Sequence, residues 1–386
     1  MTKYSDLEIV ELVNQLLNDA LVKRASDIHF EPYQDLYRIR MRIDGVLQPI
    51  AILSTLLVKP LTVRLKIMAN LNIAEQRLPQ DGQLMIDKHT MRISTIPIID
   101  GEKIVLRIMK DQQDTFSLEQ LGLSENDQFH YRQALNNPQG LILVTGPTGS
   151  GKTITLYSGL KELNESSRNI CSVEDPVEMP IIGINQTQVN PKAGLDFAKT
   201  LRSFLRQDPD IIMIGEIRDH ETAQISVQAA QTGHLVLSTL HTNSSAEALI
   251  RLNQMGIKNY LIASSLKLII AQRLARKLCH HCKVIADEKF VIEEYGKRLL
   301  YPHYLAKGCQ HCIGGYYGRI GIYELLIITP QIQALLAEND QFSLNNIVQI
   351  MKKYEINTLD LSGIALVKQG ITSLAEIQRV LGLINE

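Results

Sequence analysis

We predict an α/β protein of at least two domains from three observations. The chain has 386 residues, more than one hydrophobic core ordinarily holds. Its first third contains segments that alternate polar and apolar residues, as half-buried strands do, together with Asp-Gly turn signals. From about residue 118, strand-like runs alternate with helix-like segments, which is typical of a mostly parallel sheet covered by helices.

The first domain is expected over residues 1–111. Apolar residues recur at helical spacing from Leu7 to Leu21, so an amphipathic helix opens it. Strand-like runs follow over 28–108, interrupted by a helix-compatible stretch over 55–71. The pairs Asp44-Gly45, Asp81-Gly82 and Asp100-Gly101 predict hairpin turns between these strands. Polar, turn-forming residues predict a linker over 112–120.

The second domain is expected over residues 121–278. A cysteine-bearing insert follows over 279–317, and a helical C-terminal subdomain over 318–386. We predict strands at 140–145, 169–173, 184–189, 211–215 and 235–240, and helices at 195–206, 221–232 and 246–255.

A glycine-rich loop, GPTGSGKT over 146–153, lies between an apolar run and a helix-compatible stretch, the context that a phosphate-binding loop needs. Its glycines allow backbone N–H groups to converge on phosphate oxygens at a helix N-terminus. Lys152 is expected to reach the β and γ phosphates, and the Thr153 hydroxyl to bind Mg²⁺. The pattern therefore predicts ATP with Mg²⁺, bound by Gly146, Thr148, Gly149, Ser150, Gly151, Lys152 and Thr153.

Acidic residues follow two further predicted strands: Glu174 in SVEDPVE and Glu216 in IIMIGEIRD. Ligands of a doubly wound sheet bind at the carboxyl ends of its strands, so both are expected near the nucleotide. Phosphoryl transfer to water needs an oriented water and a held metal. We assign Glu174 to the water and Glu216 to the Mg²⁺ shell; the reverse order stays open, and either carboxylate could instead cap the next helix.

Two histidines, His234 and His241, flank the predicted strand 235–240. A histidine at such a strand end could contact a γ-phosphate or a carboxylate, and so distinguish ATP from ADP. We therefore include both among the candidate catalytic residues.

Four cysteines form two Cys-x2-Cys pairs, the pattern of a tetrahedral structural zinc site. Four thiolates leave no open coordination position, so the metal would stabilise the fold and take no part in catalysis. The 26 residues between the pairs predict a small helix over 289–300, and the alternative is four reduced thiols without metal. The zinc ligands are expected to be Cys279, Cys282, Cys309 and Cys312; the fifth cysteine, Cys171, is expected to be a buried thiol.

The formal charge of −1 gives no global basic field, so a nucleic acid is not the expected partner. The N-terminus has no signal-peptide pattern, and no window approaches 18 consecutive apolar residues. We expect a cytoplasmic protein that reaches a membrane only through partners.

Together the motifs resemble those of the type II secretion and type IV pilus-assembly ATPases. SDIHFEP (26–32), the phosphate loop, VEDPVE, IIMIGEIRD, TGHLVLSTLHTN, the four-cysteine insert and GGYYGRIGIYELL (314–326) occur in this order. The resemblance implies a PAS-like N-terminal domain, a RecA-like ATPase core and a homohexameric motor that hydrolyses ATP to drive pilus or pseudopilus assembly and protein export. It also implies attachment to the inner membrane through a platform protein. The chain resembles the short form, which lacks the extra N-terminal domain that docks on a membrane-anchored partner.

The resemblance also implies roles for single residues. Glu174 matches the Asp-box glutamate, Glu216 the Walker B glutamate, and His234 and His241 the His box.

Two arginines of the first domain are implied to face the nucleotide: Arg92 in MRISTIP and Arg107 in IVLRIM. The alternative for both is an outward position on a strand. The alternative function is a RecA-like nucleic-acid translocase of the competence or conjugation type, which predicts a basic channel and ATP hydrolysis stimulated by DNA.

Overall fold

The computed structural model describes residues 6–109, 117–294, 297–338 and 343–382. The chain divides into two compact units, Met1–Asp114 and Thr115–Glu386. Most of the linker predicted over 112–120 lies outside the described residues. In the described ranges, no helix combines the length and the apolar character needed to cross a bilayer.

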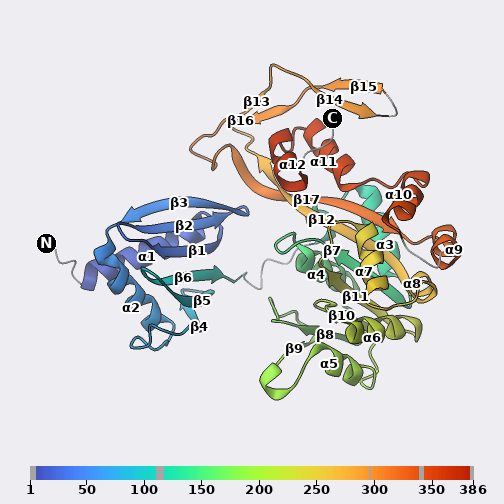
Figure 1. Ribbon diagram of the computed structural model, residues 1–386, viewed down its shortest axis with the longest axis horizontal. Coiled ribbons are helices and arrows are strands. Elements are labelled where there is room, and N and C mark those ends of the chain that lie inside the picture. The colour runs from blue at the N-terminus through green and yellow to red at the C-terminus, as the bar shows by residue number, and fades with distance from the viewer. Residues whose placement is uncertain (1–5, 110–116, 295–296, 339–342, 383–386) are drawn as a thin grey trace. The chain divides into compact units, whose positions relative to one another are not determined.

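The N-terminal unit is a six-stranded antiparallel sheet with strand order β3-β2-β1-β6-β5-β4 (Figure 1). Its strands alternate buried apolar and more exposed polar residues, as Tyr37–Ile43 illustrates, so one face packs on helices and the other is polar. The elements are α1 (Asp6–Val22), β1 (Ala25–Pro32), β2 (Tyr37–Ile43), β3 (Val46–Leu53), a 3-10 turn (Thr55–Leu57), α2 (Val58–Met68), β4 (Gln80–Ile86), β5 (His89–Ile98) and β6 (Gly101–Ile108).

One of the predicted hairpin turns is wrong. Asp44-Gly45 does turn between β2 and β3, with φ of +49° and +86° as a tight two-residue hairpin requires. Asp81-Gly82 instead lies inside β4, paired with β5. Its glycine serves close packing, because a Cβ at Gly82 would lie 2.8 Å from the Leu71 side chain.

The C-terminal unit has a seven-stranded sheet with order β17-β12-β7-β11-β10-β8-β9. Neighbouring strands are parallel except for β17, which runs antiparallel to β12. The strands are β7 (Gly140–Thr145), β8 (Ile170–Glu174), β9 (Asn185–Gln188), β10 (Ile211–Ile214), β11 (Leu235–Leu240), β12 (Leu266–Leu278) and β17 (Tyr316–Ile327).

Helices cover both faces of this sheet and make two separate cores. The first core contains apolar residues of α5 to α10, and the second contains those of α3 and α4. Strands buried on both faces are mostly apolar along their whole length, which explains the runs 140–145 and 235–240. The helices are α3 (Glu125–Leu135), α4 (Lys152–Leu163), α5 (Phe197–Phe204), α6 (His220–Gln231), α7 (Ser245–Gln254), α8 (Asn259–Ser265), α9 (Pro330–Glu338) and α10 (Leu344–Lys353), with 3-10 turns at Leu118–Leu121 and Pro191–Ala193.

The cysteine-bearing insert contains two β-ribbons. β13 (Lys283–Ile285) pairs with β16 (Tyr304–Ala306), and β14 (Phe290–Glu294) pairs with β15 (Lys297–Tyr301). The helix predicted over 289–300 is therefore wrong. Phe290 and Tyr301 face each other across the ribbon with ring centroids 6.0 Å apart, a cross-strand aromatic pair that favours a hairpin.

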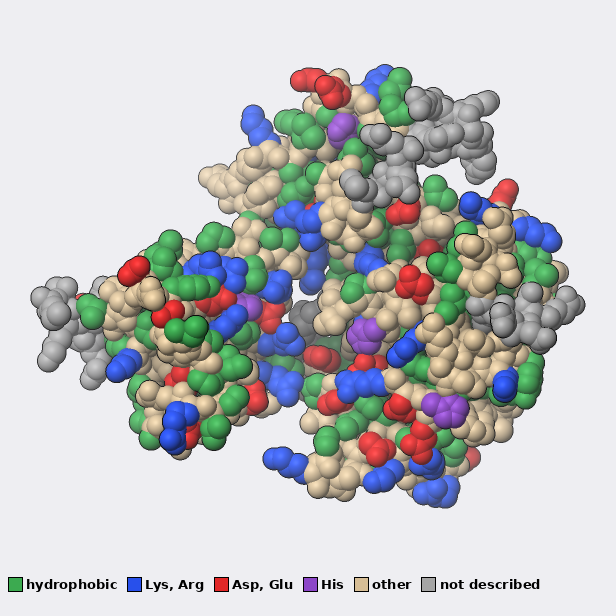
Figure 2. Space-filling view, in the orientation of Figure 1, with side chains coloured by type: hydrophobic (Ala, Val, Ile, Leu, Met, Phe, Trp, Pro, Cys, Tyr) green, Lys and Arg blue, Asp and Glu red, His purple; other side chains and the backbone are tan. Residues whose placement is uncertain are grey.

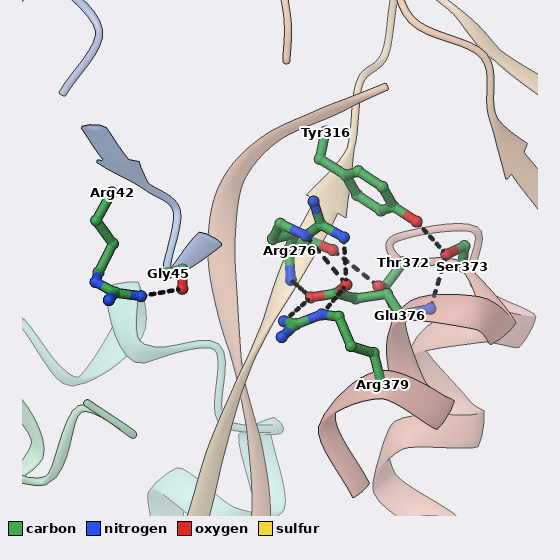
Figure 3. Close-up of polar contacts among 8 residues, drawn as sticks. All are labelled: Arg42, Gly45, Arg276, Tyr316, Thr372, Ser373, Glu376 and Arg379. Atoms are coloured by element: carbon green, nitrogen blue, oxygen red, sulfur yellow. Dashed lines mark hydrogen bonds and ion pairs between the residues drawn. The ribbon is translucent and has the colours of Figure 1, made fainter. Parts of the chain in front are cut away.

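The chain ends in α11 (Leu359–Lys368) and α12 (Leu374–Leu381), which follow α9 and α10. Residues 318–327, which we grouped with the helical subdomain, belong to strand β17 of the main sheet. Helix α12 is joined to β12 by Glu376, a fully buried carboxylate that pairs with Arg276 and Arg379 (Figure 3).

Candidate nucleotide and metal sites

The phosphate loop has the backbone shape that only glycine allows. Gly146 has φ of +151°, and a Cβ there would lie 2.5 Å from the carbonyl oxygen of Gln272 on β12. Gly151, with φ of +93°, is the N-cap of α4. Ser150 is buried, and its hydroxyl has no hydrogen-bond partner within the described residues. A buried polar atom without a partner fits a loop built to receive phosphate oxygens.

Lys152 is buried against this loop. Its Nζ donates to the carbonyl oxygens of Gly146 at 2.8 Å and Pro147 at 3.1 Å. Burial, and to a smaller extent Arg273, lowers the pKa of the Lys152 ammonium to about 8 against the opposing effect of Glu216. An ammonium that burial destabilises in this way gains from binding an anion.

Glu216 and His241 meet at the carboxyl ends of β10 and β11. His241 Nε2 lies 3.0 Å from Glu216 Oε2. Arg218 also pairs with Glu216, and its Nη1 lies 3.7 Å from Asp175. Burial opposes ionisation of Glu216, but Arg218 and His241 outweigh it and hold the pKa of that carboxyl below its usual range. Glu216 is therefore ionised at neutral pH, as a metal ligand must be.

Glu174 ends β8 and is 3% exposed. It accepts hydrogen bonds from the Tyr157 hydroxyl, from Ser172 Oγ at 2.7 Å and from Gln186 Nε2 at 3.1 Å. Burial, together with the Glu174 charge, raises the pKa of Tyr157, which keeps that hydroxyl a donor. Three donors fix this carboxylate in one orientation.

His234 lies at the amino end of β11, at the opposite end of the strands from the phosphate loop. It precedes β11, whereas His241 follows it, and a six-residue strand spans about 20 Å. Its ring Nδ1 lies 3.1 Å from the carbonyl oxygen of Ala229, and its own carbonyl accepts from Gly140 at the start of β7. The structure thus does not bring His234 to the phosphate loop of its own chain.

Arg92 and Arg107 lie opposite each other on β5 and β6, on the polar face of the N-terminal sheet. Arg107 Nε donates to Asp27 at 2.9 Å while its side chain stays 64% exposed. Arg92 is exposed and makes no hydrogen bond or ion pair with the described residues. On the same face, burial opposes ionisation of Glu31, but Arg40 and Lys103 lower the pKa of Glu31 to about 2.

The four predicted metal ligands come together. Their sulfur atoms all lie within 4.8 Å of one another, and three of the pairs are 3.7 to 3.9 Å apart. A zinc ion with Zn–S bonds of about 2.3 Å separates its sulfurs by about 3.8 Å, so the cluster fits a tetrahedral ion. The remaining cysteine, Cys171, is a buried free thiol as expected.

Three functional candidates were missed from the sequence: Tyr157, Arg218 and Arg273. Arg218 carried a signal, because it stands two residues after Glu216 in the same motif. Arg273 donates to the Asn243 carbonyl and side-chain oxygens at 3.1 Å, which joins β12 to the segment after His241. Nothing in the local sequence indicates that contact or the one from Tyr157.

Comparison with known proteins gives matches along almost the whole chain. Residues 2–379 match the family model described as Type II/IV secretion system protein. The chain is 50% identical to the protein transport protein HofB homolog of Escherichia coli, over 97% of this chain and 81% of that protein. It is 47% identical to the type IV pilus assembly ATPase PilB of Pseudomonas aeruginosa, over 97% of this chain and 68% of that protein. The solved structure of the Legionella pneumophila ATPase DotB shares the fold, with a TM-score of 0.71 at 22% identity, covering 98% of this chain and 96% of that one.

Proposed function

The chain belongs to the Type II/IV secretion system protein family, and we infer that it is an ATPase that powers type IV pilus or pseudopilus assembly and protein export. The ATPase activity is inferred from the residues at the carboxyl ends of the C-terminal sheet's parallel strands. These residues are a phosphate loop whose backbone requires glycine, the buried Lys152, and an ionised Glu216 paired with His241.

We assign the roles at this site as follows. Backbone N–H groups of the loop and Lys152 hold the β and γ phosphates, and Thr153 binds Mg²⁺. Glu216 completes the Mg²⁺ shell, directly or through water, and His241 senses the terminal phosphate through its contact with Glu216. Glu174 polarises the attacking water. This role is supported by the three hydrogen bonds that its buried carboxylate accepts, because they hold it in a fixed orientation.

We further propose a homohexamer in which Arg92 and Arg107 approach nucleotide held by a C-terminal unit. Arg107 is oriented by Asp27 yet largely exposed, and Arg92 is exposed without a partner in the described chain. Such arginines are available to stabilise charge on a transferred phosphoryl group. We leave His234 out of this site.

Zn²⁺ is the metal that we propose for the four-cysteine cluster, because the sulfur spacing matches a tetrahedral thiolate site. With four protein ligands the ion stabilises the insert and supplies no catalytic group. We propose the division into domains that the sequence predicts, except that residues 318–327 belong to the sheet of the ATPase domain.

The proposed setting is the cytoplasmic side of the inner membrane, with attachment through a platform protein. No nucleic acid partner is proposed, since basic and acidic side chains are interspersed on the visible face (Figure 2) and the net charge is −1.

The test is phosphate release from ATP by the purified protein. Lys152→Ala should abolish it, while Lys161→Ala, which changes an exposed lysine of the same helix, should leave it intact. Glu216→Gln should lower turnover at least about 100-fold and retain nucleotide binding. Retained turnover in Lys152→Ala would refute the site. Stimulation by DNA, and none by the cytoplasmic domain of a platform protein, would favour the translocase.

A further inference from the structure

The segment that follows β11, residues 241–245, contacts the nucleotide site at two points. His241 pairs with Glu216, as described above. The Thr242 N–H donates to Thr145 Oγ1 at 3.0 Å, and the two threonine hydroxyls lie 2.7 Å apart. Because Thr145 directly precedes Gly146, a shift of segment 241–245 changes the support of the phosphate loop.

On its other side, segment 241–245 is bound to Glu324 of β17, which is 3% exposed. Glu324 Oε1 accepts hydrogen bonds from the Ser245 N–H at 2.7 Å and from the Ser245 hydroxyl at 2.6 Å. Its second oxygen, Oε2, accepts from the Leu359 N–H at 3.3 Å. Ser245 is the first residue of α7, and Leu359 is the first residue of α11.

One buried carboxylate therefore lies at two helix N-termini, where unpaired N–H groups and the helix dipole favour negative charge. Neither helix needs Glu324 as its cap. Ser244 Oγ accepts from Glu247 N–H at 3.2 Å in α7, and Thr358 Oγ1 accepts from Leu361 N–H at 3.5 Å in α11. The contribution of Glu324 is therefore a connection between the helices.

A hollow of about 1220 Å³ lies beside this connection. Pro147 and Asn243 line one side of it, and residues of α10 to α12 line the other. Glu324 is a side chain in its wall that hydrogen-bonds to both sides. Beside this open space, the hydrogen bonds of Glu324 to Ser245 and Leu359 connect the two sides directly.

We propose that Glu324 is a positioning residue that couples the nucleotide site to the C-terminal helices. By fixing the start of α7 it keeps His241 within reach of Glu216, and through Leu359 it transmits nucleotide-dependent shifts of segment 241–245 to α11. The proposal rests on the ATPase function proposed above.

The test compares Glu324→Gln with Glu355→Gln. Glu355 lines the same hollow, is exposed, and its side chain makes no hydrogen bond within the described chain, so its loss should change nothing. A glutamine has one acceptor oxygen and one NH₂ donor. If the oxygen keeps both bonds to Ser245, the NH₂ faces the Leu359 N–H, donor against donor.

The readouts are amide hydrogen exchange and ATPase kinetics. In Glu324→Gln, exchange at the start of α11 should accelerate by about tenfold, the equivalent of one lost hydrogen bond. A non-hydrolysable ATP analogue should slow exchange at the starts of both α7 and α11 in the wild-type protein, but only at α7 in the variant. The kcat should fall at least about tenfold while KM changes less than about threefold, a split that general destabilisation does not produce.

The proposal would be overturned if the analogue slowed amide exchange at the start of α11 equally in the wild-type protein and in Glu324→Gln. A wild-type protein that binds the analogue but releases no phosphate from ATP would count against the proposed function only, because the exchange experiment does not need turnover. If Glu324→Gln does not fold, Ser245→Ala removes one of the three donors and keeps the backbone N–H. It should weaken the α11 response by about threefold, and an unaltered response would refute the coupling.

Discussion

Glu376→Gln should destabilise the C-terminal unit more than any single change to the arginines around it. Glu376 is 0% exposed and accepts hydrogen bonds from the Arg276 backbone N–H at 3.0 Å, from the Arg276 guanidinium at 2.7 and 3.0 Å and from Arg379 at 2.6 and 2.8 Å (Figure 3). Glutamine removes the negative charge and turns an NH₂ group towards guanidinium donors. Both arginines then lose their counter-ion, and Arg276 loses it in a largely buried setting.

Removing one partner of a buried ion pair costs about 3–5 kcal/mol. The lower end applies here, because Arg379 is 46% exposed and can turn to water, while Arg276 is 16% exposed and cannot. We therefore expect a loss of about 3 kcal/mol, which lowers Tm by roughly 6 to 12 °C in a unit of this size. Arg276→Ala should cost more than Arg379→Ala, since Arg276 also stacks on the Tyr316 ring at 3.9 Å.

The assay is urea unfolding followed by far-UV circular dichroism, with exposed Glu355→Gln as the control. Burial opposes ionisation of Glu376, but Arg379 and Arg276 outweigh it and lower its pKa. A lowered folded-state pKa gives stability that is present above the unfolded value of about 4.3 and is lost as pH falls through the folded pKa. The difference between wild type and Glu376→Gln should therefore be constant from pH 6 to 8 and narrow below about pH 4. A difference under about 0.5 kcal/mol at pH 7 would refute the reasoning.

Three other predictions concern the nucleotide, the metal and the assembly. Burial lowers the pKa of Lys152 to about 8, and phosphate binding needs the ammonium. Affinity for ATP should therefore be flat below about pH 7 and about tenfold weaker at pH 9 than at pH 7, measured by calorimetry; a flat profile to pH 9.5 would contradict it. Elemental analysis should find one Zn²⁺ per chain, and a chelator should lower the melting temperature; no metal and an unchanged melting curve would remove the zinc site. If Arg92 and Arg107 act between subunits, turnover per chain should fall on dilution, whereas a concentration-independent rate would argue for a site complete within one chain.

Local patterns predicted most of the fold because strong signals lay within single segments. The runs 140–145 and 235–240 are strands with unchanged bounds, and the helices predicted at 195–206, 221–232 and 246–255 differ from α5, α6 and α7 by one or two residues at each end. The sequence analysis does not predict the long strand β12, and it places residues 318–327 of β17 in the helical subdomain. Strands β12 and β17 form backbone hydrogen bonds with each other across about 50 residues of sequence, and no local pattern encodes that pairing. The ribbon β14–β15 was mistaken for a helix because its aromatic pair is visible only once the strands are aligned.

The sequence predicts those parts of the site that directly follow a strand of the parallel sheet. The loop 146–153, Glu216 and His241 come together because parallel strands bring their carboxyl ends to one edge. His234 shows the limit of that rule, because it stands at the other end of the same strand. Contacts to Glu174 from Tyr157, and to Asn243 from Arg273, join separate elements, so they required the three-dimensional structure.

The excursion from 283 to 308 leaves the four-sulfur cluster and returns to it, since the flanking Cys282 and Cys309 belong to one group of thiols within 4.8 Å. The excursion is also held between its two ends, because Phe290 packs in one hydrophobic cluster with Ala271 of β12 and Ile322 of β17, and Lys283 Nζ donates to the carbonyl oxygen of Gly370 at 2.8 Å. A short glycine-serine tether in place of the excursion would therefore expose apolar surface of β12, β17 and α11 in addition to removing the ribbons.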